Sequence, residues 1–397
     1  MGFARLGTIA LAGFTAFVYY GLIRAPRLHG AAAITVAVLV SLLIVAALAW
    51  IPLNRTLKNL DAWRPVTATF ASALTFLLYL GLALMLIGLV NLIWWLIAGT
   101  GHVPVDLLLL TARLRFVRIA TATAVVVALG ITAYGFNEAH HPALTAVEVS
   151  SPDLPAQFDG FRIALIADIH VGVGLGRPFV HGIVDQVNQA KPDLIVIAGD
   201  LSNGTPAQLG YDLEPLTQLK ADDGVLVTTG NHEFDADAQG WIDWLDAHDL
   251  PVLDNSGVVL TRGEASIDVL GINDRVGTAP HEPDLEAAVQ YLHQTYGVPV
   301  DGAGRFRILI AHEPLQVYGQ DHLASKIGVD LQLSGHTHGG QIWPIGIFVT
   351  TEQPVLDGTH MLDGITVVTS RGAGAWGPPE RVAAPPEIPI ITLHCVD

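Results

Sequence analysis

The chain has 397 residues, of which 51% are hydrophobic and only 14% are charged, with 20 Lys and Arg against 37 Asp and Glu. The acidic balance argues against a nucleic-acid polymer as a partner. The single cysteine, Cys395, excludes a disulfide framework and a thiolate metal site.

The two parts of the chain differ in charge. Residues 1–137 contain nine Lys and Arg and two acids, a net charge of +7, whereas residues 138–397 contain 11 and 35, a net charge of −24. We therefore expect a transmembrane region at 1–137 and a globular domain at 156–397, joined by a short connector at 138–155. The connector has no Gly/Ser linker and includes a strand-like stretch, Thr145–Val149, so it would hold the domain near the lipid surface.

Four long segments of the first region contain no Lys, Arg, Asp or Glu and are long enough to cross a hydrocarbon layer. A buried helix of a soluble domain would be shorter and amphipathic, so the pattern favours about four transmembrane helices. No small-residue cleavage site precedes Arg24, so we expect the first segment to be retained. The predicted spans are Leu6–Ile23, Ala31–Leu53, Val66–Ala98 and Ile119–Phe136.

Loop charge gives only a weak preference for the orientation of these spans. An even number of spans places both ends of the region on one side of the membrane. No Lys or Arg follows the last span until Arg162, which favours an extracytoplasmic position for the globular domain. The flanking charges nearly balance, with Arg24, Arg27, Arg113, Arg115 and Arg118 on one side against Arg5, Arg55, Lys58 and Arg64 on the other.

Five polar blocks in the globular domain each follow an apolar run typical of a buried strand. Helical patterns alternate with these runs, which predicts an α/β fold. In open α/β sheets the ligand crevice lies just outside the carboxyl ends of the strands, so the five blocks can converge. The strand-like runs and their following residues are Arg162–Ala167 before Asp168 and His170, Asp193–Ala198 before Asp200, Val225–Thr229 before Asn231 and His232, Phe306–Ala311 before His312, and Leu331–Ser334 before His336 and His338. Helices are expected at Pro178–Ala190, Trp241–His248 and Asp284–Tyr296, and further strands at Ile365–Thr369 and Ile388–Leu393.

The side chains in these blocks are suitable metal ligands. Two Asp, one Asn and four His offer a mixed set of oxygen and nitrogen donors. Such a set suits Mn²⁺, Fe²⁺, Fe³⁺ or Zn²⁺ rather than Ca²⁺, which prefers oxygen donors alone. The sequence therefore predicts a metal site built from several strand ends.

The order and spacing of the blocks resemble the calcineurin-like metallophosphoesterase superfamily. The stretch Gly335–Gln341, with the sequence GHTHGGQ, further resembles its bacterial, membrane-associated cell-envelope branch. The resemblance extends over Ala146–Asp397 and does not include the apolar region. It implies a four-layer αββα sandwich with two mixed sheets for the catalytic domain.

The resemblance also implies a role for each residue. One metal ion would be held by Asp168, His170 and His338, the other by Asn231, His312 and His336, and Asp200 would bridge the two. The pair of divalent or trivalent ions would share a hydroxide that attacks phosphorus. His232 corresponds to the family's non-ligand histidine, which donates a proton to the leaving oxygen or stabilises charge on the phosphoryl group.

Four further residues near the blocks have competing interpretations. Asn203 occupies the position where many relatives carry an Asp that orients the histidine at position 232, and an amide supplies no charge there. Arg371 is either a solvated loop residue or a contact to the substrate phosphate. Glu233 is interpreted as a capping or salt-bridging carboxylate and is left out of the site. Gln341 could position the loop behind His338.

Three hypotheses for function follow. The leading one is a membrane-anchored phosphohydrolase with two metal ions that cleaves a phosphodiester, pyrophosphate or phosphomonoester bond, with a lipid or cell-envelope intermediate as substrate and the bacterial inner membrane as location. The second is a catalytically weak scaffold or sensor that keeps the fold and a metal, favoured only by Asn203. The third is a transporter or receptor with an appended hydrolase, which the lack of charged residues within the spans disfavours.

Overall fold

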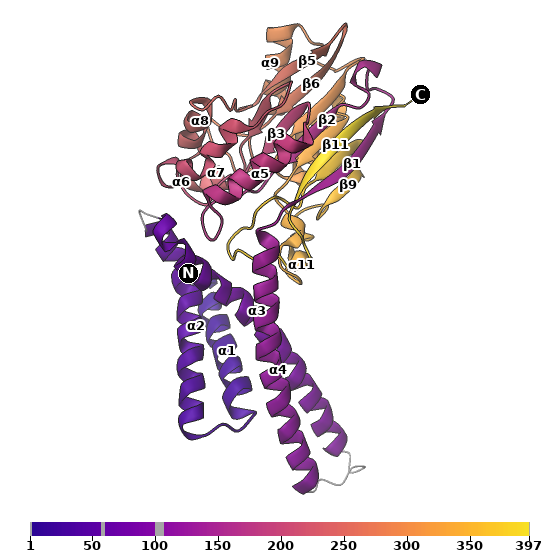
Figure 1. Ribbon diagram of the computed structural model, residues 1–397. Helices are drawn as coiled ribbons and strands as arrows, with labels where there is room; N and C mark the ends of the chain where they lie inside the picture. Colours follow the sequence, from indigo (N-terminus) through magenta and orange to yellow (C-terminus); the bar gives the residue numbers. More distant parts are fainter. Residues whose placement is uncertain (1, 57–59, 100–106, 397) are drawn as a thin grey trace. The chain divides into compact units, whose positions relative to one another are not determined.

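The protein is described by a computed structural model for residues 2–56, 60–99 and 107–396 (Figure 1). The chain divides into two compact units. The first unit comprises residues 1–56 and 65–136, and the second comprises residues 57–64 and 137–397. Each unit is considered separately below.

In its described residues the first unit consists of helices joined by a short loop at residues 25–29. Three of its helices are long and apolar enough to cross a membrane, over Gly30–Trp50, Ala62–Ala98 and Leu109–Ala139. Large apolar side chains along them are exposed, as expected for a surface that faces lipid. The helices are α1 (Gly2–Tyr19), a π-helix (Tyr20–Arg24), α2 (Gly30–Thr56), α3 (Leu60–Gly99) and α4 (Leu107–Ala139).

These helices differ from the sequence prediction in two respects. The first predicted span, Leu6–Ile23, lies in a helix whose apolar stretch within the described side chains is the shorter Leu11–Arg24. Helix α4 begins at Leu107, well before the predicted start at Ile119, and therefore includes three arginines. Long arginine side chains can extend towards water at the end of a span. The first turns of a transmembrane helix can therefore contain charged residues.

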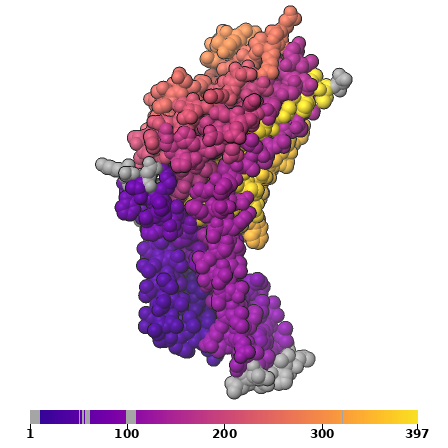
Figure 2. Space-filling model, in the orientation of Figure 1, coloured from indigo at the N-terminus to yellow at the C-terminus, as the bar shows by residue number. Residues whose placement is uncertain are grey.

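The second unit contains a five-stranded mixed sheet in the order β1-β11-β2-β3-β4. Strands β1 and β11 are parallel, β11 is antiparallel to β2, and β2, β3 and β4 are parallel to one another. The β1–β11 pair brings the two ends of the unit side by side (Figure 2). The strands are β1 (Ala143–Ser151), β2 (Arg162–Ile166), β3 (Leu194–Ala198), β4 (Val225–Thr228) and β11 (Glu387–Cys395).

A second mixed sheet has six strands in the order β5-β6-β7-β8-β10-β9. Its four central strands, β6, β7, β8 and β10, are parallel, whereas both edge strands are antiparallel to their neighbours. The strands are β5 (Ser256–Arg262), β6 (Ala265–Gly271), β7 (Phe306–Ile310), β8 (Leu331–Ser334), β9 (Gly358–Leu362) and β10 (Ile365–Thr369).

Seven α-helices accompany the sheets in the described part of this unit. Helix α5 illustrates why they form: its buried residues Val180, Ile183, Val184 and Val187 recur with the spacing of one helical face, and a proline stands in its first turn. The helices are α5 (Arg177–Ala190), α6 (Pro206–Leu213), α7 (Asn231–Ala236), α8 (Ala238–Asp246), α9 (Leu285–Tyr296), α10 (Gly319–Lys326) and α11 (Gly346–Val349).

Three apolar cores hold the layers together. One packs Ile197 and its neighbours in the first sheet against α5, α6 and α8. A second joins the inner faces of the two sheets, for example Leu165 with Ile308. A third packs Leu309 and its neighbours in the second sheet against α9. The parallel strands are buried on both faces, and their carboxyl ends are left to carry polar loops.

Candidate metal centre

The candidate ligands stand at the carboxyl ends of buried strands and have unusual backbone geometry. Five of them adopt the left-handed region, which is uncommon for residues other than glycine and concentrates at functional sites. The loops therefore turn sharply straight after each strand and aim the side chains towards one place. The φ angles are 55° for Asp168, 48° for His170, 56° for Asp200, 72° for His336 and 54° for His338.

A first cluster of donor atoms joins the loops after β2, β3 and β8. Nε2 of His170 lies 3.0 Å from Nε2 of His338 and 3.4 Å from Oδ2 of Asp200. Oδ1 of Asp168 lies 3.4 Å from Nε2 of His338 and 3.9 Å from Nε2 of His170. Atoms this close that all carry lone pairs form a cage of the size that holds one metal ion.

A second cluster joins the loops after β3, β4, β7 and β8. Nε2 of His312 lies 3.3 Å from the same Oδ2 atom of Asp200. Nδ1 of His336 lies 3.3 Å from Nε2 of His312 and 3.0 Å from Oδ1 of Asn231. Asp200 thus belongs to both clusters through one oxygen atom. The seven ligands predicted from the sequence all lie in these two adjoining clusters.

Backbone hydrogen bonds fix the two carboxylates. The backbone N–H of His336 donates to both oxygens of Asp168 at 3.0 Å. The backbone N–H of His232 donates to Oδ1 of Asp200 at 2.8 Å, which leaves Oδ2 directed at the two clusters. Glycines permit this close packing, because a Cβ at Gly335 would lie 2.3 Å from Oδ2 of Asp168.

Three ligand histidines are oriented through the ring nitrogen that points away from the clusters. Nδ1 of His312 donates to the carbonyl of Ala198 at 2.6 Å, and Nδ1 of His170 donates to Oδ1 of Asn203 at 3.0 Å. The buried guanidinium of Arg381 donates to Nδ1 of His338 at 3.0 Å. Such partners set the tautomer and the ring angle of a metal ligand.

Glu233 fixes the backbone of the loop that carries Asp200. Its oxygens accept backbone N–H groups from Asp200 at 2.9 Å, Leu201 at 2.8 Å and Gly230 at 2.7 Å. The side chain is fully buried, and burial together with the charge of Asp200 raises its pKa to about 7. The bond to Gly230 is the helix cap that the sequence interpretation allowed. The bonds to Asp200 and Leu201 also tie the β3 loop to the β4 loop, a role that the interpretation did not include.

The electrostatics of the clusters suit a cation. Burial lowers the pKa of His170 to about 3 and that of His336 to about 4, so both rings are neutral and offer lone pairs. Burial alone would raise the pKa of Asp200, but the neighbouring His312 outweighs it and holds that pKa well below its usual range. Asp200 in turn raises the pKa of His312 well above its usual value despite burial. The pair therefore stabilises positive charge where a metal ion would fit.

His232 stands beside the clusters. Its ring centre lies 4.6 Å from that of His170 in an edge-to-face arrangement and 6.1 Å from that of Trp376. The ring is half-buried and lines a cavity of about 310 Å³ together with Asp200 and His338. A substrate in this cavity would meet both the ligand clusters and the imidazole of His232.

Three further residues near the clusters have partners in the structure. Arg371 donates to the carboxylates of Glu387 at 2.6 Å and Asp357 at 3.2 Å and is not among the described residues that line the cavity. Asn203 orients His170 and not His232, with which it has no described hydrogen bond. Gln341 bonds to the backbone of Trp376 in both directions, at 2.7 and 2.8 Å, and so positions the loop after His338.

Residues 161–340 match the family model for calcineurin-like phosphoesterases. A protein from Danio rerio described as a transmembrane protein with metallophosphoesterase domain is 34% identical over 283 residues, or 69% of this chain and 62% of that protein. A protein of the same description from Bos taurus is 31% identical over 71% of this chain and 64% of its own length. An uncharacterized metallophosphoesterase from Helicobacter pylori is 34% identical over 58% of this chain and 59% of its own.

The chain spans less than two thirds of the length of each of these relatives. The matched residues 161–340 include strands β2 to β8 and all the clustered His and Asp side chains described above. With these ligand clusters, this match and these relatives, residues 161–340 belong to the calcineurin-like metallophosphoesterase family.

Proposed function

We propose that this protein is a membrane-anchored phosphohydrolase that uses two metal ions to cleave a phosphoester or pyrophosphate bond. The observation that carries the proposal is the shared oxygen: Oδ2 of Asp200 lies 3.4 Å from Nε2 of His170 and 3.3 Å from Nε2 of His312. One carboxylate oxygen between two sets of donors is the arrangement needed to bridge two ions.

The donor set indicates which ions fit. Asp168, His170 and His338 would hold one ion, Asn231, His312 and His336 the other, and Asp200 both. The mixture of imidazole nitrogens with carboxylate and amide oxygens suits Mn, Fe or Zn. When bound, such a pair supplies an activated water nucleophile and neutralises charge on the phosphoryl oxygens.

The remaining chemistry belongs to the protein. His232 lies on the cavity side of the clusters, where a protonated imidazole can deliver a proton to the leaving oxygen. The backbone N–H groups of His232 and His336 hold the two carboxylates, and Glu233 holds the backbone of Asp200. Asn203 and Arg381 hold two of the ligand rings. The complete ligand set favours catalysis over a scaffold or sensor that has lost it.

Apolar residues at the mouth of the cavity point to the substrate class. Ile345, Val349 and Trp376 line the cavity, and Ile347 and Phe348 beside them are 64% and 71% exposed. We call these five residues the apolar rim. The acidic second unit repels polyanions, whereas a rim of this kind accepts hydrocarbon. A lipid-linked phosphoester of the cell envelope is therefore the proposed substrate.

The proposal is tested with purified full-length protein and a nitrophenyl phosphodiester in the presence of Mn²⁺. Asp200→Asn removes the bridging charge and His232→Ala the proton donor, so we expect losses of at least about 10²–10³-fold in kcat. Asp222→Asn, an exposed carboxylate away from the site, is the matched control and should retain full turnover. Equal turnover in all three variants and the wild type would refute the proposal.

The membrane arrangement is part of the same proposal. We infer that the first helix forms a fourth span beside the three longer ones and that the catalytic domain lies on the extracytoplasmic side of a bacterial inner membrane. The only cysteine, Cys395, lies in the second unit and is half-buried. A membrane-impermeant maleimide should label it in intact cells after mild denaturation of surface proteins, and labelling only in lysed cells would contradict this orientation.

A further inference from the structure

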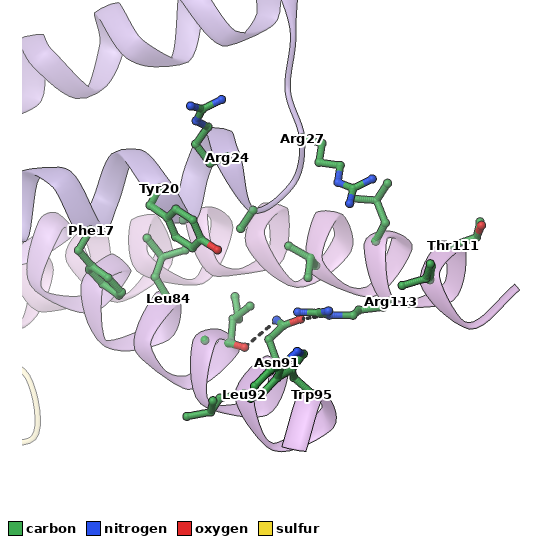
Figure 3. Close-up of a pocket in the computed structure, with 17 residues that line it drawn as sticks. Phe17, Tyr20, Arg24, Arg27, Leu84, Asn91, Leu92, Trp95, Thr111 and Arg113 are labelled. Atoms are coloured by element: carbon green, nitrogen blue, oxygen red, sulfur yellow. Dashed lines mark hydrogen bonds between the residues drawn. The ribbon is translucent and has the colours of Figure 1, made fainter. Parts of the chain in front are cut away.

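The helical unit contains a cavity of about 570 Å³ that plays no part in the metal chemistry. It is lined by α1, the π-helix, the loop that follows it, α3 and α4 (Figure 3). All its lining residues belong to the first unit. The side chains that line this cavity indicate which kind of ligand fits it.

The polar part of the cavity is positively charged. Arg24, Arg27 and Arg113 line it, and no acidic side chain is among the described residues of its lining. Arg113 is half-buried, and its Nε donates to Oδ1 of Asn91 at 2.9 Å (Figure 3). Asn91 in turn donates to the carbonyl of Ile87 at 2.8 Å, which fixes its amide and hence the position of the arginine. The guanidinium groups are left to bind an anion.

The loop that carries Arg27 is fixed against α4. Nε of Arg118 donates to the carbonyl of Pro26 at 2.9 Å. Arg27 and Arg113 therefore belong to elements that are tied to each other, so the positive charge is placed before a ligand arrives. Preorganisation of this kind lowers the entropic cost of binding.

The rest of the lining is apolar. Phe17 and Leu84 line the cavity on α1 and α3, while Tyr20 and Trp95 lie nearer the arginines (Figure 3). Tyrosine and tryptophan are typical of the membrane–water interface, and arginines between helices at that depth are typical of sites for lipid head groups. The cavity is thus amphipathic in the same sense as a lipid molecule.

We propose that this cavity binds an anionic membrane phospholipid, with its phosphate beside Arg27 and Arg113 and the start of its hydrocarbon against Phe17 and Leu84. Arg113 and Phe136 are separated by about 35 Å along the single helix α4, at 1.5 Å per residue. The bound lipid therefore lies in the leaflet opposite the end of α4 that continues into the second unit. It is a separate ligand and not the substrate of the metal centre.

The test uses delipidated full-length protein in a neutral detergent. Binding of dioctanoyl phosphatidylglycerol, dioctanoyl phosphatidylcholine and inorganic phosphate is measured by native mass spectrometry and by titration of tryptophan fluorescence. We expect phosphatidylglycerol to bind at least about tenfold more tightly than phosphatidylcholine, and inorganic phosphate to bind far more weakly than either because it has no hydrocarbon.

Variants assign the binding to this cavity. Arg27→Gln and Arg113→Gln should each weaken binding of phosphatidylglycerol about fivefold, the effect of one cation near an anionic lipid surface. Arg115→Gln, an exposed arginine of α4 outside the lining, is the matched control and should bind as the wild type does. If Arg113→Gln does not fold, the loop variant Arg27→Gln decides alone.

Three outcomes would overturn the proposal. Equal affinity for the two lipids would show that charge is not recognised, and an Arg115→Gln loss as large as that of Arg27→Gln would show that the cavity is not the site. Inorganic phosphate bound as tightly as phosphatidylglycerol would identify a site for a soluble anion. None of these measurements depends on phosphoester hydrolysis, so they stand or fall independently of the catalytic proposal.

Discussion

At the scale of single residues, the metal centre depends on groups that are not metal ligands themselves but bond to the ligand side chains. Arg381, Asn203 and the carbonyl of Ala198 each hold one ring nitrogen of a candidate ligand. Because an imidazole binds a metal through only one nitrogen, these contacts decide which nitrogen faces the cluster. The geometry of the site is therefore set one layer outside the ligands themselves.

Glu233 offers a direct test of this outer layer. Glu233 accepts three backbone N–H groups, and replacement by Gln leaves one of them without an acceptor. This should lower the free energy of unfolding by about 1–3 kcal/mol. We also expect metal affinity to fall about 10–100-fold, as for other residues that orient ligands. Urea denaturation and competition with a metal-binding dye measure the two effects.

The control for this substitution is Glu286→Gln on the exposed face of α9, which makes the same chemical change away from the site. It should alter neither stability nor metal affinity. A Glu233→Gln protein that matched this control in both measurements would show that the bonds of Glu233 to the backbone around Asp200 support neither stability nor metal binding.

The ligands could be predicted from the sequence because each stands directly after an apolar strand, where side chains of several strands converge. The residues that orient the ligand rings could not be predicted in this way. Arg381 lies 43 residues from His338 and is brought to it by the return of the chain before β11, which no local pattern reveals. Asn203 was assigned by position to His232, yet its amide meets His170, because the direction of a side chain depends on the turn that carries it.

At the scale of secondary structure, the connection between α10 and β8 carries a half-buried carboxylate that makes stability depend on pH. Asp330 accepts a hydrogen bond from the backbone N–H of Arg307 at 2.7 Å, and burial raises its pKa from 3.8 to about 6. The folded state therefore binds more protons than the unfolded state between these values. The stabilising contribution of the protonated group is present below pH 4 and is lost as pH rises through 6.

Asp330→Asn keeps the hydrogen-bond acceptor and removes the titration. Relative to the wild type, we expect the variant to gain in unfolding free energy as pH rises from 4.5 to 7. Urea midpoints of both proteins, measured in detergent with EDTA at several pH values, give the difference directly. A difference that stays constant with pH would contradict the assignment.

The strands that end at the candidate ligands were the most predictable elements, whereas β5, β6 and β9 were not predicted. The run Leu331–Ser334 coincides with β8, and the other strand-like runs differ from β2, β3, β4 and β7 by one residue at an end. Helix ends were less predictable: α8 starts at Ala238, three residues before the expected Trp241, because Asp237 caps it through the backbone N–H of Gly240. A cap formed by a residue in an irregular conformation leaves little trace in an apolar pattern.

At the scale of the whole molecule, the proposed substrate class depends on the apolar rim. Phe348→Ser changes a side chain that is 71% exposed, so it should not alter the fold. We expect unchanged hydrolysis of methyl nitrophenyl phosphate and about tenfold slower hydrolysis of hexadecyl nitrophenyl phosphate in mixed micelles, because burial of a phenyl ring is worth about 1.5–3 kcal/mol. The same chromophore is released from both esters.

Met361→Ser is the matched control, since Met361 is 67% exposed on β9 and does not belong to the apolar rim. It should leave both rates unchanged. Equal effects of Phe348→Ser on the short and the long ester, or no effect on either, would show that the rim does not recognise hydrocarbon.

The division into an apolar helical region and an α/β domain was predictable from hydropathy and charge, which change together near residue 137. Pairing of the strands was not, because β1 and β11 are separated by more than 230 residues yet lie side by side in register. Strand Ala143–Ser151 also places half of the expected connector within the first sheet. Long-range pairing depends on the packed core and leaves no mark in either segment alone.

The central claim is that two metal ions share the carboxylate of Asp200. Anomalous diffraction from crystals of the Mn²⁺-loaded protein, recorded at the manganese edge, tests it most directly. We predict two peaks on either side of this carboxylate, one beside Asp168, His170 and His338 and the other beside Asn231, His312 and His336. A single peak, or peaks remote from Asp200, would contradict the account.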